Sequence, residues 1–76
     1  MTPQERFGAN LRRLRGAAGL TQQALWDATG INMTEISRLE NGHKDPRLST
    51  IVRLSVGLGL PPEALITGTA EGLSSA

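Results

Sequence analysis

The stretch Leu20–Gly42, which reads LTQQALWDATGINMTEISRLENG, decides the fold of this chain. It predicts two short helices joined by a tight turn. Thr21 stands where the first helix should begin. Asn32, followed three residues later by Glu35, has the spacing of a capping box, in which each side chain hydrogen-bonds the other residue's backbone N–H. Because Gly30 lies between the helices, where a sharp turn favours a residue without a Cβ, the pattern predicts a helix-turn-helix.

The second of these helices, expected over residues 32–40, has two chemically different sides. At about 100° per residue, Ile36 and Leu39 fall on an apolar side that should face a core. The opposite side carries Met33, Thr34, Ser37 and Arg38. A helix that enters a DNA major groove presents such groups to the base edges, whereas the alternative interpretation is an ordinary solvated surface.

The residues before this stretch predict one longer helix. Thr2–Glu5 combines a capping threonine, a proline at the first helical position and a glutamate that completes a capping box. The helix should end near Gly19. Its apolar residues recur at helical spacing and comprise Phe7, Leu11, Leu14 and Ala18.

The residues after Gly42 predict two further helices and a tail. A fourth helix should start at Leu48 or Ser49 and end before Gly59, and Pro61–Glu63 should start a short fifth helix. From Thr67 onward small and polar residues dominate, with little to anchor a core. We therefore expect one domain over residues 1–67 and a flexible tail or linker over residues 68–76.

Composition excludes several classes of protein. The 76 residues suffice for one domain, and the net charge of +1 is only a weak indication of a nucleic-acid partner, although every basic residue except Arg53 precedes Leu48. No apolar run reaches membrane-spanning length, residues 1–10 lack a signal-peptide segment, and the absence of cysteine suits a reducing cytoplasm. His43 has no plausible companion ligands for a metal, and no catalytic constellation is present. We expect a cytoplasmic protein that is not an enzyme and needs no cofactor, metal or membrane.

The run GLTQQALWDATGINMTEISRLENG resembles the helix-turn-helix of phage-repressor-like regulators, the lambda/Cro or xenobiotic-response-element family. The resemblance extends from about Phe7 to Ile66, and its most specific part is ISRLENG, from Ile36 to Gly42. It implies an all-α, compact five-helix lambda-repressor-like domain that binds double-stranded DNA, usually as a homodimer.

The resemblance and the residue chemistry together predict a DNA-binding surface. Gln22 lies in the first turn of its helix, where free N–H groups favour a phosphate, and it matches a backbone contact of the family, as does Asn41. Arg38 can reach guanine O6 and N7, or alternatively a phosphate. The expected DNA contacts are Gln22, Asn32, Met33, Thr34, Ser37, Arg38, Asn41, Lys44 and Arg47.

Two further positions are informative when compared with the family. Arg15 and Glu40 match an Arg–Glu pair that links the first helix to the end of the third. Trp26 departs from the family, which usually has a small residue there because the second and third helices cross closely. We expect the indole to pack in the core, and an exposed partner contact is the alternative.

The fifth helix is the expected dimer surface, because its apolar residues exceed what so short a helix needs. These residues are Leu60, Leu65 and Ile66. A dimer would place two recognition helices about 34 Å apart on an inverted repeat. Other interpretations remain open: a restriction–modification controller, an antitoxin that also binds a toxin, a protein-interaction module that does not bind DNA, or the N-terminal reader of a longer protein.

Overall fold

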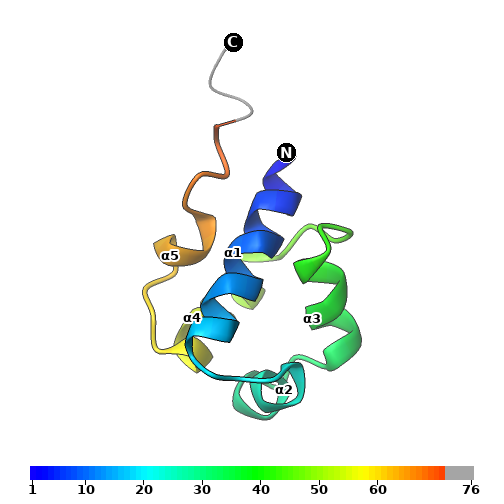
Figure 1. Cartoon of the computed structure of the whole chain (residues 1–76), viewed down its shortest axis with the longest axis vertical. Helices are drawn as coiled ribbons and strands as arrows, with labels where there is room; N and C mark the ends of the chain where they lie inside the picture. The colour runs from blue at the N-terminus through cyan, green and yellow to red at the C-terminus, as the bar shows by residue number, and fades with distance from the viewer. Residues whose placement is uncertain (72–76) are drawn as a thin grey trace.

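The computed structural model describes residues 1–71, and within that range the chain is all-helical, as predicted (Figure 1). Figure 1 shows α1 in the middle of the molecule with α3 on one side and α5 on the other, while α2 closes the lower end. The helices are α1 (Pro3–Ala17), α2 (Gln22–Thr29), α3 (Met33–Glu40), α4 (Leu48–Leu58) and α5 (Glu63–Ile66). Residues 72–76 of the expected tail lie outside the described residues, so its boundary remains a prediction.

The predicted caps begin α1, α2 and α3. Thr2 and Glu5 form both halves of a capping box, with distances of 3.1 Å from the Glu5 N–H to Thr2 Oγ1 and 2.7 Å from the Thr2 N–H to Glu5 Oε1. Thr21 Oγ1 accepts a hydrogen bond from the Ala24 N–H at 3.0 Å. These bonds satisfy N–H groups that have no partner inside a helix.

The cap of α3 differs from the prediction in one half. Asn32 Oδ1 accepts from the Glu35 N–H at 2.8 Å, as expected. However, the Glu35 carboxylate does not complete the box. It lies 3.4 Å from Lys44 Nζ, because the loop after α3 folds back beside the start of that helix.

The turn between α2 and α3 depends on Gly30. Its φ of 77° lies in the left-handed region, which residues with a Cβ adopt only with strain. In this conformation its N–H donates to the Trp26 carbonyl at 2.7 Å and ends α2. The next residue, Ile31, enters the core together with Ile36, and two apolar residues so placed around the Asn32 cap have the arrangement of a hydrophobic staple.

One core joins the helices, and α1 lies at its centre. Its buried apolar residues are Phe7, Leu11, Leu25, Ile31, Ile36, Leu39, Leu54 and Leu65. Both residues of the predicted apolar side of α3 belong to it. By contrast, Ala18 is exposed at the end of α1, and Leu48 is 76% exposed at the start of α4.

The expectation that Trp26 packs in the core is wrong. Its side chain is 39% exposed, whereas Leu25 and Thr29 are the buried residues of α2. Residues four apart share one side of a helix, and the neighbouring position is turned by about 100°. The crossing of α2 and α3 is therefore filled without the indole, which lies at the surface.

The expectation that Leu65 contributes to a dimer surface is also wrong, because Leu65 is fully buried within the chain. Asn10 of α1 explains why: its Nδ2 donates to the carbonyls of Leu65 and Thr67, both at 2.8 Å. These bonds hold α5 against α1 with Leu65 turned inward. Ile66 remains 45% exposed, and Leu60 is half-buried.

Candidate nucleic-acid interface

The outward side of α3 is accessible over its whole length. Met33 is 37% exposed, Thr34 and Arg38 are exposed, and Ser37 is half-buried. The guanidinium of Arg38 makes no hydrogen bond or ion pair within residues 1–71, so its donors are available to another molecule. A short helix with one buried side and this polar side can lie against a groove of DNA without exposing its core.

A network around Glu40 fixes the position of α3. Arg15 forms a bidentate pair with the Glu40 carboxylate, with Nε 2.6 Å from Oε2 and Nη2 3.0 Å from Oε1. Arg15 Nη1 also donates to the Leu20 carbonyl at 2.9 Å. Only 3% of the Glu40 side chain is exposed, and the hydrogen bond with Glu40 raises the pKa of Arg15. The network links α1, the start of α2 and the end of α3.

Gln22 belongs to this network, which the sequence interpretation did not foresee. Its Nε2 donates to Glu40 Oε1 at 3.1 Å. A glutamine amide has two N–H donors, so one remains for the predicted phosphate contact. No sequence signal pairs Gln22 with Glu40, because the two residues come from different helices and meet only in the fold.

Asn41 occupies the C-cap of α3 and turns back onto that helix. Its Nδ2 lies 2.9 Å from the Ser37 carbonyl and 3.5 Å from Ser37 Oγ. The predicted backbone contact of Asn41 therefore competes with the longer of these two contacts, the one to Ser37 Oγ.

The loop after α3 is held in place at both sides. Lys44 pairs with Glu35 of α3, and Gln4 of α1 donates from Nε2 to Asp45 Oδ1 at 3.1 Å. Arg47 follows as the exposed N-cap residue of α4 and makes no side-chain capping bond.

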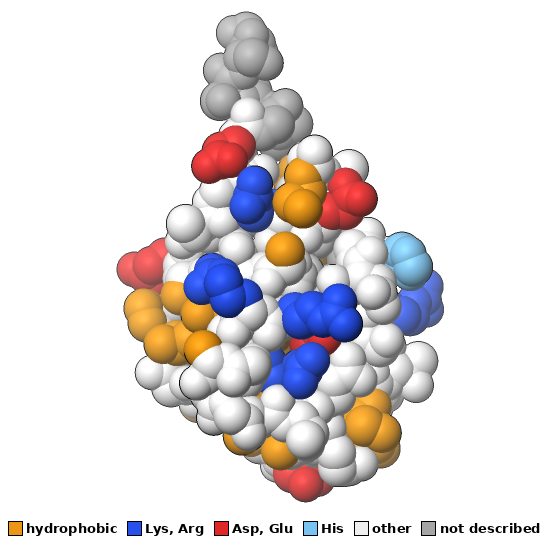
Figure 2. Space-filling model, viewed as in Figure 1, with side chains coloured by type: hydrophobic (Ala, Val, Ile, Leu, Met, Phe, Trp, Pro, Cys, Tyr) orange, Lys and Arg blue, Asp and Glu red, His pale blue; other side chains and the backbone are white. Residues whose placement is uncertain are grey.

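Positive charge is also present outside the predicted contacts. Figure 2 shows Lys and Arg side chains gathered along α1 on the face toward the viewer. Arg12 and Arg13 are exposed on this helix. No helix within residues 1–71 is long and apolar enough to cross a bilayer, and no group of His, Cys, Asp or Glu side chains in this range could hold a metal ion.

Comparisons with known proteins identify the class to which this geometry belongs. The profile of the family described as "Helix-turn-helix domain" matches residues 6–66. An uncharacterized HTH-type transcriptional regulator of Sinorhizobium fredii, y4dJ, is 34% identical over 71 residues, which cover 93% of this chain and 92% of that protein. Other curated relatives are longer, and the match spans 23% of a regulator from Mycobacterium bovis that is 39% identical over 59 residues.

Two solved structures share the fold. The restriction-modification controller protein C.AhdI of Aeromonas hydrophila superposes with a TM-score of 0.79 and 32% identity, over 82% of this chain and 94% of that one. The clp gene regulator ClgR of C. glutamicum gives a TM-score of 0.85 over all of this chain and 99% of that one, and its 24% identity supports the fold alone. The chain therefore belongs to the helix-turn-helix family, with a lambda-repressor-like fold. It is a helix-turn-helix transcriptional regulator, a class that binds double-stranded DNA.

Proposed function

We propose that the chain reads a specific sequence in double-stranded DNA by placing α3 in the major groove. The observation that carries the proposal is the exposed side of α3, where Arg38 has donors without a partner inside the described residues. Arg38 can donate two hydrogen bonds to one guanine, while Thr34 and Met33 offer methyl surface to thymine. Ser37 adds a hydroxyl.

Phosphate contacts on both sides of α3 would orient it in the groove. Gln22 at the start of α2 retains an amide N–H, and Asn41 at the end of α3 can give up its long 3.5 Å contact with Ser37 Oγ to bind a phosphate. Asn32 at the start of α3 and the loop residues Lys44 and Arg47 complete the proposed set. Such contacts position a protein on DNA but do not themselves select a sequence.

We further propose that the active form is a homodimer on an inverted repeat. Exposed apolar side chains of α4 and α5 support this, namely Val52, Val56 and Ile66, together with Leu60 in the loop before α5. Figure 2 also shows apolar side chains at the surface beside that loop. A chain that stays monomeric in sedimentation at high micromolar concentration, with and without DNA, would contradict the dimer.

Selection of bound duplexes from a random pool, followed by sequencing, tests the proposal. We expect an inverted repeat whose half-sites are centred about one helical turn apart. Matched selection with Arg38→Gln should lose a preference for guanine at one position of each half-site. Recovery of DNA without any motif would mean that the protein contacts only the backbone. No recovery even at low salt would favour a protein-interaction module instead.

A further inference from the structure

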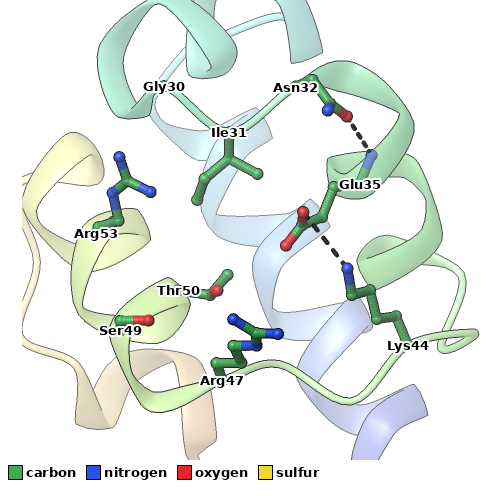
Figure 3. A pocket seen from close by; sticks show the side chains of 9 residues that line it. All are labelled: Gly30, Ile31, Asn32, Glu35, Lys44, Arg47, Ser49, Thr50 and Arg53. Carbon is green, nitrogen blue, oxygen red and sulfur yellow. Dashed lines mark hydrogen bonds and ion pairs between the residues drawn. The ribbon is translucent and has the colours of Figure 1, made fainter.

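A pocket of about 320 Å³ lies where the α2–α3 turn, the start of α3, the loop after α3 and the first turns of α4 meet (Figure 3). We call it the α3–α4 pocket, and its charged lining residues are Glu35, Lys44, Arg47 and Arg53. Arg53 and the residues of the first turn of α4 have no role in the proposed reading of DNA. The volume lies at the lower end of the range for sites that bind small molecules.

The α3–α4 pocket has excess positive charge. Glu35 and Lys44 are paired at 3.4 Å and largely neutralise each other. The guanidinium groups of Arg47 and Arg53, in contrast, make no hydrogen bond or ion pair within residues 1–71. Figure 3 shows both side chains at the pocket, with Arg53 beside Gly30.

The beginning of α4 adds backbone N–H donors, which also favour a negatively charged ligand. Arg47 is the N-cap residue and provides no side-chain cap, so the first N–H groups of this helix have no capping partner. Free N–H groups at a helix N-terminus, with the positive end of the helix dipole, favour an anion. Ser49 and Thr50 of this first turn line the pocket.

Thr50 adds a neutral donor to the lining of the α3–α4 pocket. The residue is only 8% exposed, yet its hydroxyl has no hydrogen-bond partner within residues 1–71. In Figure 3 its side chain lies at the centre of the pocket, between Ile31 and Arg47. Since no fully enclosed side-chain N or O atom within residues 1–71 lacks a hydrogen-bond partner, the Thr50 hydroxyl is open to the pocket, where it can donate to a ligand.

We propose that the α3–α4 pocket binds a phosphate group, with inorganic phosphate or a small phosphate monoester as its ligand. Arg47 and Arg53 would donate to the phosphate oxygens, which match the planar guanidinium in geometry and charge. The hydroxyl of Thr50 and the N–H groups at the start of α4 would complete the shell. The phosphate group could instead belong to the backbone of bound DNA. Only in that case does the assignment of the pocket rest on the proposed function.

Titration of the full chain with inorganic phosphate, followed by ¹H–¹⁵N NMR at constant ionic strength kept with chloride, tests the site. We expect saturable shifts concentrated at the α2–α3 turn and the first turn of α4. Arg53→Gln should raise the Kd about tenfold, since it removes a charged donor. The matched control Arg12→Gln, on α1, should leave the Kd unchanged. Shifts that fail to saturate, or that spread equally over the arginines of α1, would overturn the proposal.

Three further variants guard against effects of altered folding. Glu35→Gln should lower the Kd severalfold, because it removes the one carboxylate in the α3–α4 pocket and releases Lys44. A gain in affinity cannot come from unfolding. Thr50→Val should weaken phosphate binding while Thr50→Ser, which keeps the hydroxyl, should not. Equal Kd values for all three variants and the parent chain would contradict the site.

Duplex binding distinguishes the two sources of phosphate. If the ligand is a free phosphate, Arg53→Gln leaves the affinity for a selected duplex unchanged. If DNA supplies the group, the same variant weakens duplex binding about tenfold, and inorganic phosphate competes with DNA more strongly than chloride at equal ionic strength. A chain that binds phosphate but no duplex would refute the proposed function and leave the pocket assignment intact.

Discussion

The guanidinium of Arg15 in α1 binds both the Leu20 carbonyl before α2 and the Glu40 carboxylate at the end of α3, and its removal would leave that carboxylate buried without its charge partner. We expect Arg15→Ala to lower the free energy of unfolding by about 3–5 kcal/mol, the usual cost of breaking a buried pair on one side. Urea denaturation followed by circular dichroism measures this loss. Arg12→Ala, at an exposed position of the same helix, should change it by less than about 0.5 kcal/mol.

A second substitution distinguishes two contributions to this loss of stability: the unpaired charge of Glu40 and the missing contacts of Arg15. In the double variant Arg15→Ala, Glu40→Gln, no buried carboxylate is left without a partner, so part of the stability should return. Equal urea midpoints for Arg15→Ala and Arg12→Ala would show that the pair does not stabilise the fold.

Glu5 gives the start of α1 a dependence on pH. Hydrogen bonds from the Thr2 backbone and side chain hold the pKa of Glu5 below its ordinary value of 4.5. Because the folded pKa lies below the unfolded one, the contribution of Glu5 to stability is present above about pH 4.5 and is lost as the pH falls through the folded pKa. Thermal melts between pH 7 and pH 3 should therefore show a smaller loss of Tm for Glu5→Gln than for the parent chain. Parallel curves would contradict this role.

At the scale of elements, the spacing of α1 and α3 depends on Gly8. A Cβ at this position would lie 2.3 Å from the Leu39 carbonyl oxygen and 2.6 Å from that of Glu40. Gly8→Ala should therefore push the two helices apart and cost at least about 1–3 kcal/mol, as overpacking does. It should also weaken DNA binding, because the hydrogen bonds between Arg15 and Glu40 cross the same α1–α3 contact and fix the position of α3.

Gly16 provides the matched control in the same helix. A Cβ there would meet nothing within 4 Å, so Gly16→Ala should stabilise the chain by up to about 1 kcal/mol through helix propensity alone. Urea denaturation of both variants measures the difference. A tolerated alanine at position 8 would show that α1 and α3 can separate without cost.

The sequence predictions are correct where the interacting residues are close in the sequence and wrong where the position of a side chain depends on distant residues. Caps at Thr2, Thr21 and Asn32 are formed by neighbours within three residues, so local spacing was sufficient to find them. The resemblance added the five-helix arrangement. By contrast, the positions of Trp26 and Leu65 depend on how distant helices pack, and periodicity cannot specify that.

The candidate DNA-binding surface also has a part that local geometry predicts and a part that depends on contacts between distant residues. The outward side of α3 follows from helical geometry, and the structure exposes Met33, Thr34 and Arg38 as that geometry predicts. The bonds of Gln22 to Glu40, of Glu35 to Lys44 and of Asn10 to the end of α5 join residues from separate elements. No spacing in the sequence encodes such pairs, and the α3–α4 pocket arises from the same kind of long-range contact.

At the scale of the whole molecule, a net charge of +1 means that attraction to DNA must come from the placement of charge rather than from its sum. Each phosphate neutralised by a basic side chain releases counterions and adds about 0.9 to the slope of log K against log salt on duplex DNA. If Arg47 contacts a phosphate, Arg47→Gln should reduce that slope by about 0.9. Fluorescence anisotropy of a labelled duplex over a series of salt concentrations measures it.

The control for this prediction is Arg6→Gln, which removes the same charge from the molecule. Arg6 pairs with Glu71 at 3.5 Å and is not among the proposed DNA contacts. Its loss should lower affinity slightly and leave the slope unchanged, because no counterion-releasing contact disappears. If both variants shift the slope equally, overall charge rather than position governs binding, and the assignment of the loop after α3 to the DNA backbone fails.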